Sequence, residues 1–183
     1  MPEESGGARR APLKPFLWFW GVAIAATAAD LLTKWVAFAN LGLPGQRESE
    51  VWLIKGFVGF RTSANYGSLF GLFQGAGWLL IPVSFVALAV IIWIVHFRKR
   101  RVDNLTFWVL AFLVGGVVGN LYDRIVHGFV RDFIGLHAGS FTWPYFNLAD
   151  AYITVGIVIL AVRSLFVKEG GGGEERNADS GRA

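Results

Sequence analysis

The sequence contains no cysteine among its 183 residues, so disulfides, thiol nucleophiles, zinc–thiolate sites and iron–sulfur clusters are all excluded. It also lacks the HExxH pattern of zinc proteases and the GxSxG pattern of serine hydrolases. Of its three histidines, His127 and His137 lie ten residues apart in an expected loop, which favours surface histidines over metal ligands. Any chemistry must therefore come from oxygen and nitrogen side chains, and we expect neither a metal nor a cofactor.

Charge is also scarce in this chain. Only 16% of the residues are charged, whereas 54% are hydrophobic and the mean hydropathy is +0.49. This composition is far more apolar than that of a soluble domain, and it predicts a single integral membrane domain. The net charge of +4 could indicate nucleic-acid binding. The basic residues flank apolar runs, however, as membrane topology requires, so no nucleic acid is expected as a partner.

Four apolar runs are each long enough to cross a hydrocarbon core of about 30 Å. The predicted spans cover residues 16–39, 78–97, 104–122 and 146–167. They make residues 16–167 one mainly α-helical membrane domain. Cations gather at one end of these spans, at Arg9, Arg10, Lys14, Arg98, Lys99, Arg100, Arg101, Arg163 and Lys168. By the positive-inside rule that end is cytoplasmic, so the polar tails, residues 1–15 and 168–183, are both expected in the cytoplasm.

Two segments are expected outside the bilayer, on its outer side. Residues 41–77 contain proline, glycine and charged side chains, and their stretch VWLIKGFVGFRTS is rich in β-branched and aromatic residues. We predict a small outer-leaflet β-sheet there, between the first and second helices. Residues 123–145 are predicted to form a second outer loop. Before this loop, the GGVVG segment predicts close helix packing at Gly115 and Gly119.

Polar side chains that a membrane span rarely carries gather in one layer at the outer interface. Counting about 1.5 Å per residue along the spans places six of them at a similar depth, namely Asp30, Asn120, Asp123, Asp132, Asn147 and Asp150. Asp30 and Lys34 lie four residues apart on one helical face, which favours a structural ion pair. The inner halves of the spans carry almost no ionisable group. This asymmetry indicates a functional site near the outer face.

Two carboxylates that meet in a partly dry pocket share one proton. The ionised group can then activate water, while the protonated group stabilises a developing oxyanion and later protonates the leaving amine, which is the chemistry of an aspartic peptidase. The residues alone leave open which carboxylates pair. Asp123 directly precedes Arg124, so a local ion pair is its expected fate. Asp132 lies in a mixed apolar loop, where a raised pKa is easier to achieve.

Five short blocks occur along the chain, which are DLLTK at 30–34, NYGSLFG at 65–71, FLVGGVVGNLYDR at 112–124, VRDF at 130–133 and FNLAD at 146–150. In this order, and on four spans of this topology, they resemble the lipoprotein signal peptidases (signal peptidase II), a family of bacterial membrane aspartic peptidases. The resemblance covers about residues 16–167. Ser68 stands where this family more often has alanine, a small departure that concerns only the shape of the pocket.

The resemblance implies an enzyme of the bacterial cytoplasmic (inner) membrane that cleaves the signal peptide from a prolipoprotein, just before a cysteine that carries a diacylglyceryl group. It implies an outer sheet that cradles the substrate and a catalytic pair, Asp132 and Asp150. It also implies substrate-binding or supporting positions at Asn65, Asn120, Arg124 and Asn147, and structural polar residues at Asp30, Lys34 and Asp123. The expected partners are lipid-modified prolipoproteins and membrane lipid, and we expect a monomer.

Two other functions stay open on the residues alone. A proton- or ion-coupled carrier would use a relay made of Asp30, Lys34, Asp123 and Asp150. Such relays usually need acidic groups nearer the midplane and in the inner half of the membrane, and those are missing. A non-catalytic assembly subunit built on GGVVG packing would leave Asp132 and Asn147 unexplained.

Overall fold

The computed structural model of the protein describes residues 14–46, 50–67, 75, 77–97 and 102–167. The described helices are α1 (Lys14–Leu41), α2 (Leu80–Phe97), α3 (Asn104–His127) and α4 (Leu148–Val167), with a short 3-10 turn (Gly77–Leu79) before α2. All four helices are long and apolar enough to cross a membrane, which confirms the predicted mainly α-helical membrane fold. Ser68, the cations at 98–101 and the tail residues 1–13 and 168–183 lie outside the described residues.

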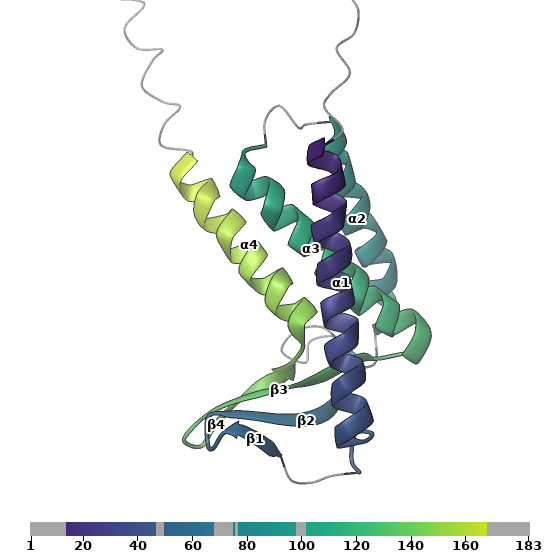
Figure 1. Ribbon diagram of the computed structural model, residues 1–183, viewed down its shortest axis with the longest axis vertical. Coiled ribbons are helices and arrows are strands. Elements are labelled where there is room, and N and C mark those ends of the chain that lie inside the picture. Colours follow the sequence, from purple (N-terminus) through teal and green to yellow (C-terminus); the bar gives the residue numbers. More distant parts are fainter. Residues whose placement is uncertain (1–13, 47–49, 68–74, 76, 98–101, 168–183) are drawn as a thin grey trace, which may run out of the picture.

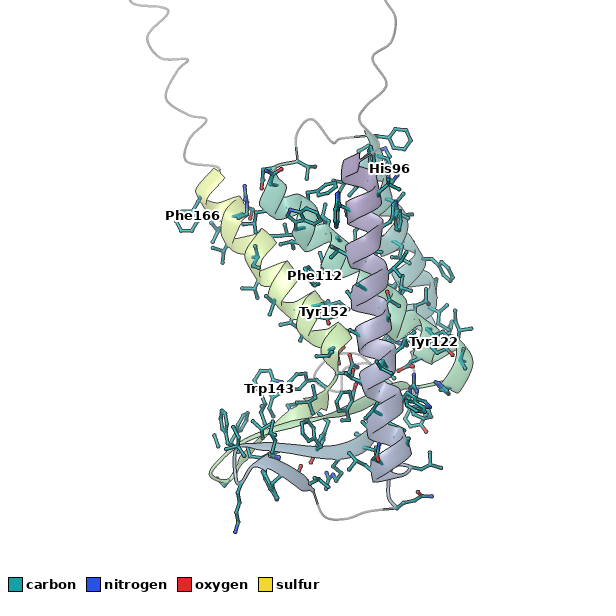
Figure 2. All side chains as sticks on the ribbon, viewed as in Figure 1. His96, Phe112, Tyr122, Trp143, Tyr152 and Phe166 are labelled. Carbon is teal, nitrogen blue, oxygen red and sulfur yellow. The ribbon has the colours of Figure 1, made fainter. Side chains whose placement is uncertain are left out.

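α2, α3 and α4 stand on one side of a small sheet, whereas α1 continues alongside the sheet, and the first turn of α1 and the last turn of α4 both lie at the end away from the sheet (Figure 1). α3 is the central helix, with twelve buried residues, whereas α2 has two, Ile91 and Val95. Large apolar side chains cover the outer faces. Phe166 on α4, for example, is 72% exposed and points away from the bundle (Figure 2). Such faces suit hydrocarbon, which solvates apolar side chains as well as a protein core does.

Glycines allow α3 to approach its neighbours closely. A methyl group on Gly115 would lie 2.6 Å from the Cβ atom of Ala26 in α1. A methyl group on Gly116 would lie 2.7 Å from a backbone oxygen in the first turn of α4, and one on Gly119 would collide with the carboxylate of Asp30. The predicted close packing at Gly115 and Gly119 is therefore confirmed, and Gly116 adds a contact with α4.

We expect Gly116→Ala to lower the melting temperature of the protein. The added methyl would press on the α4 backbone, which cannot move aside as a flexible side chain can, and such overpacking costs about 1–3 kcal/mol. Gly21→Ala in α1 is the matched control, because nothing lies within 4 Å of a methyl group at that position. Thermal unfolding of both variants in detergent measures the difference. Equal melting temperatures would contradict the close packing of α3 against α4.

The described sheet is antiparallel in the order β1-β2-β3-β4. Its strands are β1 (Val51–Ile54), β2 (Val58–Asn65), β3 (Val130–Ala138) and β4 (Phe141–Phe146). The predicted small sheet is confirmed, and β1 and β2 fall within residues 41–77 as predicted. The prediction of a loop at 123–145 is wrong, because this segment supplies half of the sheet.

In residues 123–145, polar residues interrupt the alternating apolar pattern that usually identifies a strand in a sequence. Arg131 and Asp132 interrupt the apolar alternation of β3, yet both are buried against other polar groups. β4 contains Pro144, which cannot donate to a ladder but is tolerated because β4 is an edge strand.

The C-terminal end of α3 forms the junction between the bundle and the sheet. α3 continues five residues beyond its predicted end at 122 and stops where Gly128 adopts a positive φ of 76°. The N–H of Gly128 donates to the backbone oxygen of Arg124 at 3.2 Å, which closes the last turn. This turn reverses the chain into β3. As a result, residues just after α3 lie beside residues within its last turns.

His127 and His137 make local contacts on the sheet side of the molecule. The ring of His127 is exposed and lies near the rings of Tyr122 and Phe129. His137 is half-buried on the sheet, where its Nε2 atom lies 3.1 Å from Glu50 Oε1. Each ring therefore has neighbours among the described residues.

Candidate active site

Asp132 lies on β3 where the sheet meets the helices, and its side chain is almost fully buried. Its Oδ1 atom accepts a hydrogen bond from Asn147 Nδ2 at 2.6 Å, and its Oδ2 atom accepts one from Asn65 Nδ2 at 3.0 Å. Antiparallel pairing of β2 with β3 brings Asn65 here, because Ser63 lies opposite Asp132. Two asparagine amides therefore fix both oxygens of this carboxylate.

Asp150 lies in the first turn of α4, and the local sequence FNLAD explains its orientation. The Oδ1 atom of Asn147 accepts from the N–H of Asp150 at 3.0 Å, while the N–H of Asn147 donates to Asp150 Oδ2 at 3.3 Å. This reciprocal pair is a capping box, here with asparagine and aspartate three residues apart. Asp150 Oδ1 accepts from Asn120 Nδ2 at 2.8 Å. Asn147 thus bonds to both Asp132 and Asp150, and it joins the two carboxylates into one site.

Lys34 is completely buried behind this site. Its Nζ atom lies 2.7 Å from Asp30 Oδ2 and 3.2 Å from Asp123 Oδ2, and it donates to Asn120 Oδ1 at 2.9 Å. The predicted ion pair of Asp30 with Lys34 is therefore confirmed. The other oxygen of Asp30 accepts from the N–H of Ala149 at 2.9 Å, which ties α1 to the start of α4.

The prediction that Asp123 pairs with its neighbour Arg124 is wrong. Asp123 binds Arg131, whose Nη2 and Nε atoms donate to Oδ1 at 2.7 and 3.0 Å and whose backbone N–H donates to Oδ2 at 3.0 Å. Adjacent residues on a helix point about 100° apart, so Asp123 and Arg124 cannot face each other. Together with Lys34 and Asp30, this pair forms a neutral buried cluster of two cations and two anions.

No role for Arg131 was predicted from the sequence. The only signal was its place beside Asp132 on a strand, where neighbouring side chains point to opposite faces. Asp132 can therefore face the site while Arg131 braces the sheet against α3.

Arg124 is only partly satisfied by the protein. Its Nη1 atom donates to the backbone oxygen of Asn120 at 3.4 Å, and its Nη2 atom donates to the backbone oxygen of Gly67 at 3.2 Å. Its Nε atom is buried and has no hydrogen-bond partner among the described residues. A buried N–H without a partner costs free energy, so this group is available to a bound ligand.

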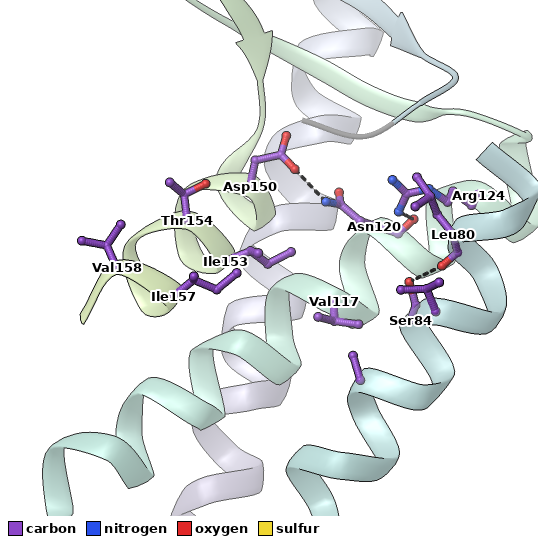
Figure 3. A pocket seen from close by; sticks show the side chains of 12 residues that line it. Leu80, Ser84, Val117, Asn120, Arg124, Asp150, Ile153, Thr154, Ile157 and Val158 are labelled. Carbon is purple, nitrogen blue, oxygen red and sulfur yellow. Dashed lines mark hydrogen bonds between the residues drawn. The ribbon is translucent and has the colours of Figure 1, made fainter. Parts of the chain in front are cut away.

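A cavity of about 440 Å³ opens beside these groups between α2, α3 and α4 (Figure 3). Asp150, Asn120 and Arg124 form its polar end, and Figure 3 shows the amide of Asn120 turned toward Asp150. The remaining lining is mostly apolar, from Leu80, Val83, Ser84, Ala87, Val117, Ile153, Thr154, Ile157 and Val158. The cavity can therefore hold an apolar chain with a polar bond at the carboxylate end.

The chain matches the family model described as Signal peptidase (SPase) II over residues 22–166. This chain belongs to the signal peptidase II family. It is therefore a membrane protease, and the carrier and assembly-subunit alternatives fall away. The five blocks of the sequence all lie within the matched region.

Relatives of this chain in two named bacteria carry the name lipoprotein signal peptidase. A protein of Rhodopirellula baltica named lipoprotein signal peptidase is 38% identical over 178 residues, which cover 89% of this chain and 78% of the relative. One of the same name from Francisella tularensis is 34% identical over 162 residues, covering 86% of this chain and 97% of the relative. A bacterial membrane enzyme structure solved by the in meso method at 2.3 Å resolution has a TM-score of 0.71 and 24% identity, covering 89% of this chain and 93% of that one. This structural similarity supports the fold.

The surroundings of Asp132 favour the neutral form of its carboxyl group. Burial, and then the nearby charge of Asp150, raise its pKa from 3.8 to about 8. The hydrogen bonds from Asn65 and Asn147 and the charge of Lys34 oppose this increase. Burial and the nearby charge of Asp150 therefore favour the protonated form of the Asp132 carboxyl group, in the direction expected for its apolar surroundings.

The folded protein should become less stable as the pH rises. Asp132 keeps its proton in the folded state up to about pH 8, whereas an unfolded carboxyl loses it near 3.8. Between these values the folded state binds more protons than the unfolded state, so the free energy of unfolding decreases with pH, and the loss is complete above the folded pKa. Melting temperatures from about pH 5 to about pH 9 should fall in the wild type and fall less steeply in Asp132→Asn. Identical slopes would contradict the raised pKa.

Proposed function

We propose that this protein is an aspartic endopeptidase that removes the signal peptide from diacylglyceryl-modified prolipoproteins, cleaving just before the lipidated cysteine. The observation that carries the proposal is the link of Asp132 to Asp150 through Asn147, with Asp150 at the polar end of an apolar cavity. Membership of the signal peptidase II family, and relatives named lipoprotein signal peptidase, support the substrate class.

The two carboxyl groups divide the reaction between them. The ionised group takes a proton from a water molecule as the water oxygen attacks the scissile carbonyl carbon. The protonated group donates a hydrogen bond to the carbonyl oxygen, where negative charge develops. As the carbon–nitrogen bond breaks, a carboxyl proton passes to the leaving amine. No metal or cofactor takes part in these steps.

Arg124 is proposed to hold the substrate backbone. Its buried Nε–H lacks a partner among the described residues and lies on a residue that lines the cavity, so a substrate carbonyl oxygen can accept from it. Asn65, Asn120 and Asn147 support the carboxylates rather than the substrate, because their amide N–H groups already donate to Asp132 or Asp150. Substrate binding should therefore depend most on Arg124.

The lipid anchor of the substrate is proposed to hold the scissile bond at the same depth in the membrane as the two carboxylates. A diacylglyceryl group anchors its cysteine at the outer interface, and the carboxylates lie at the junction of the helices with the sheet, which we assign to that interface. In this arrangement both termini lie in the cytoplasm, as the common end of α1 and α4 supports (Figure 1). The enzyme works in the bacterial cytoplasmic (inner) membrane as a monomer, since a single chain supplies both aspartates and the three asparagines that bind them.

The test is cleavage by the purified protein in liposomes. A precursor that carries the diacylglyceryl group should be cut, and the released peptide should end at the residue before the cysteine, as measured by mass spectrometry. The same precursor without lipid should not be cut, and a metal chelator should not change the rate. Absence of cleavage of the lipid-modified precursor, or equal cleavage of the precursor without lipid, would overturn the proposal.

A further inference from the structure

Lys34 contacts the reacting pair through a single intermediate side chain. We propose that Lys34 is a positioning residue for the reaction, which acts through Asn120 to keep Asp150 ionised and so leaves the shared proton on Asp132. The inference rests on the proposed function and deepens it by assigning a role to each aspartate. Asp150 is then the group that activates water, and Asp132 is the group that assists the carbonyl oxygen and supplies the proton.

An asparagine amide can present either its oxygen or its N–H group to a carboxylate, and in this site each of three amides has its oxygen already occupied. A backbone N–H donates to the side-chain oxygens of Asn65 and Asn147, at 3.0 Å in both cases. The oxygen of Asn120 accepts instead from the ammonium group of Lys34 at 2.9 Å. Asn120 is thus the one amide of these three that a charged donor orients.

The charged donor has two consequences. A reversed Asn120 amide would place its N–H group against the Lys34 ammonium and its oxygen against the Asp150 carboxylate, and both contacts would be repulsive. In the observed orientation, the ammonium polarises the amide and strengthens its hydrogen bond to Asp150 at 2.8 Å. That bond favours the ionised form of the carboxyl group. Lys34 therefore stabilises negative charge on Asp150 without touching it.

The Lys34 cluster supplies this orientation without adding net charge. Asp30 and Asp123 balance Lys34 and Arg131, and all four side chains are buried. If Lys34 served only the packing of α1, its ion pair with Asp30 in the same helix would be enough. The third contact of the ammonium, to Asn120, connects it to the reacting pair.

The surroundings of the two aspartates differ in the same direction. Asp150 lies in the first turn of α4, where the helix dipole favours an anion, whereas Asp132 lies on a strand. The charged or titratable groups around Asp150 are Lys34 and Asp30 of α1, Arg124 of α3 and Asp132 of β3, and the part of α2 that lines the cavity contributes no charge.

The first test is the double variant Lys34→Met with Asp30→Asn. It removes one cation and one anion together, and an asparagine at 30 can still accept from the N–H of Ala149. We expect kcat to fall about tenfold or more with KM almost unchanged, and the acid limb of the kcat–pH profile to move up by about one pH unit, because the base is harder to ionise. Arg163→Gln is the control, since it breaks an ion pair with Asp103 elsewhere in the molecule, and it should leave the profile unchanged.

A second variant distinguishes a positioning role of Lys34 from a loss of activity caused by misfolding. Asn120→Ser should move the acid limb by a similar amount, and adding the Lys34 and Asp30 changes to it should produce little further movement. If the wild type cleaves and the acid limb stays in place in either Asn120→Ser or the double variant, the inference is overturned while the proposed function stands. An independent, additive movement would overturn it as well. A wild-type protein that cleaves no lipid-modified precursor overturns the proposed function and this inference with it.

Discussion

Replacing Asp132 or Asp150 with asparagine should reduce kcat for cleavage of the lipid-modified precursor by at least about 1,000-fold. Asparagine matches aspartate in size, so the site keeps its shape, but it can neither accept a proton from water nor deliver one to the leaving amine. The two variants should be almost equally inactive, because groups that act as a unit lose most of their effect when one is removed. Single-turnover cleavage in liposomes measures the loss.

Asp103→Asn is the matched control for these variants. Asp103 is an exposed carboxylate that caps α3 at the end away from the sheet, and its replacement should leave the cleavage rate unchanged. A normal rate in Asp132→Asn or in Asp150→Asn would show that the catalytic pair is wrongly assigned. A fully folded but inactive Asp123→Asn, combined with an active Asp132→Asn, would instead pair Asp123 with Asp150.

Replacing Asp123 with asparagine should strongly destabilise the protein. The change leaves Lys34 and Arg131 buried with only one balancing carboxylate, and breaking a buried ion pair on one side costs about 3–5 kcal/mol. We therefore expect a much lower melting temperature and little folded protein. The folded fraction should keep some turnover, because Asp123 touches neither Asp132 nor Asp150 in the hydrogen-bond network.

Restoring the charge balance distinguishes electrostatics from shape. Adding Arg131→Gln to Asp123→Asn removes the extra cation, so the double variant should recover part of the lost melting temperature, as measured by thermal unfolding in detergent. If Asp123→Asn alone unfolds at the wild-type temperature, the buried cluster does not stabilise the fold as argued. The single variant Arg131→Gln completes the comparison. If the double variant loses more melting temperature than Asp123→Asn and Arg131→Gln lose in sum, the loss comes from shape rather than from unbalanced charge.

Much of the architecture could be predicted because it depends on local properties of the chain. A run of apolar residues long enough to cross a bilayer is visible in any window of the sequence, and all four spans were found, with ends that differ by a few residues. The regular rise of a helix also placed Asp30, Asn120 and Asp150 at one depth before any contact was known. The capping box of α4 lies within the single block FNLAD.

The partners of each polar group could not be predicted from residues alone, because they depend on how distant segments pair. Asn65 and Asp132 are separated by 67 positions, and only the pairing of β2 with β3 brings them together. Because the chain turns back at Gly128, Asp123 forms its ion pair with Arg131. Arg124 is adjacent to Asp123 in the sequence but lies on another face of the helix.

By itself, the sequence determined a membrane bundle with a layer of carboxylates and amides, since hydropathy and helical rise act over one segment at a time. Its motifs resembled one family, and the match over residues 22–166 confirmed that family. Only the tertiary structure decided which groups meet. It joined Asp132 and Asp150 through Asn147, and it placed Lys34 behind Asn120, because hydrogen bonds and ion pairs form between side chains that folding brings within about 3 Å.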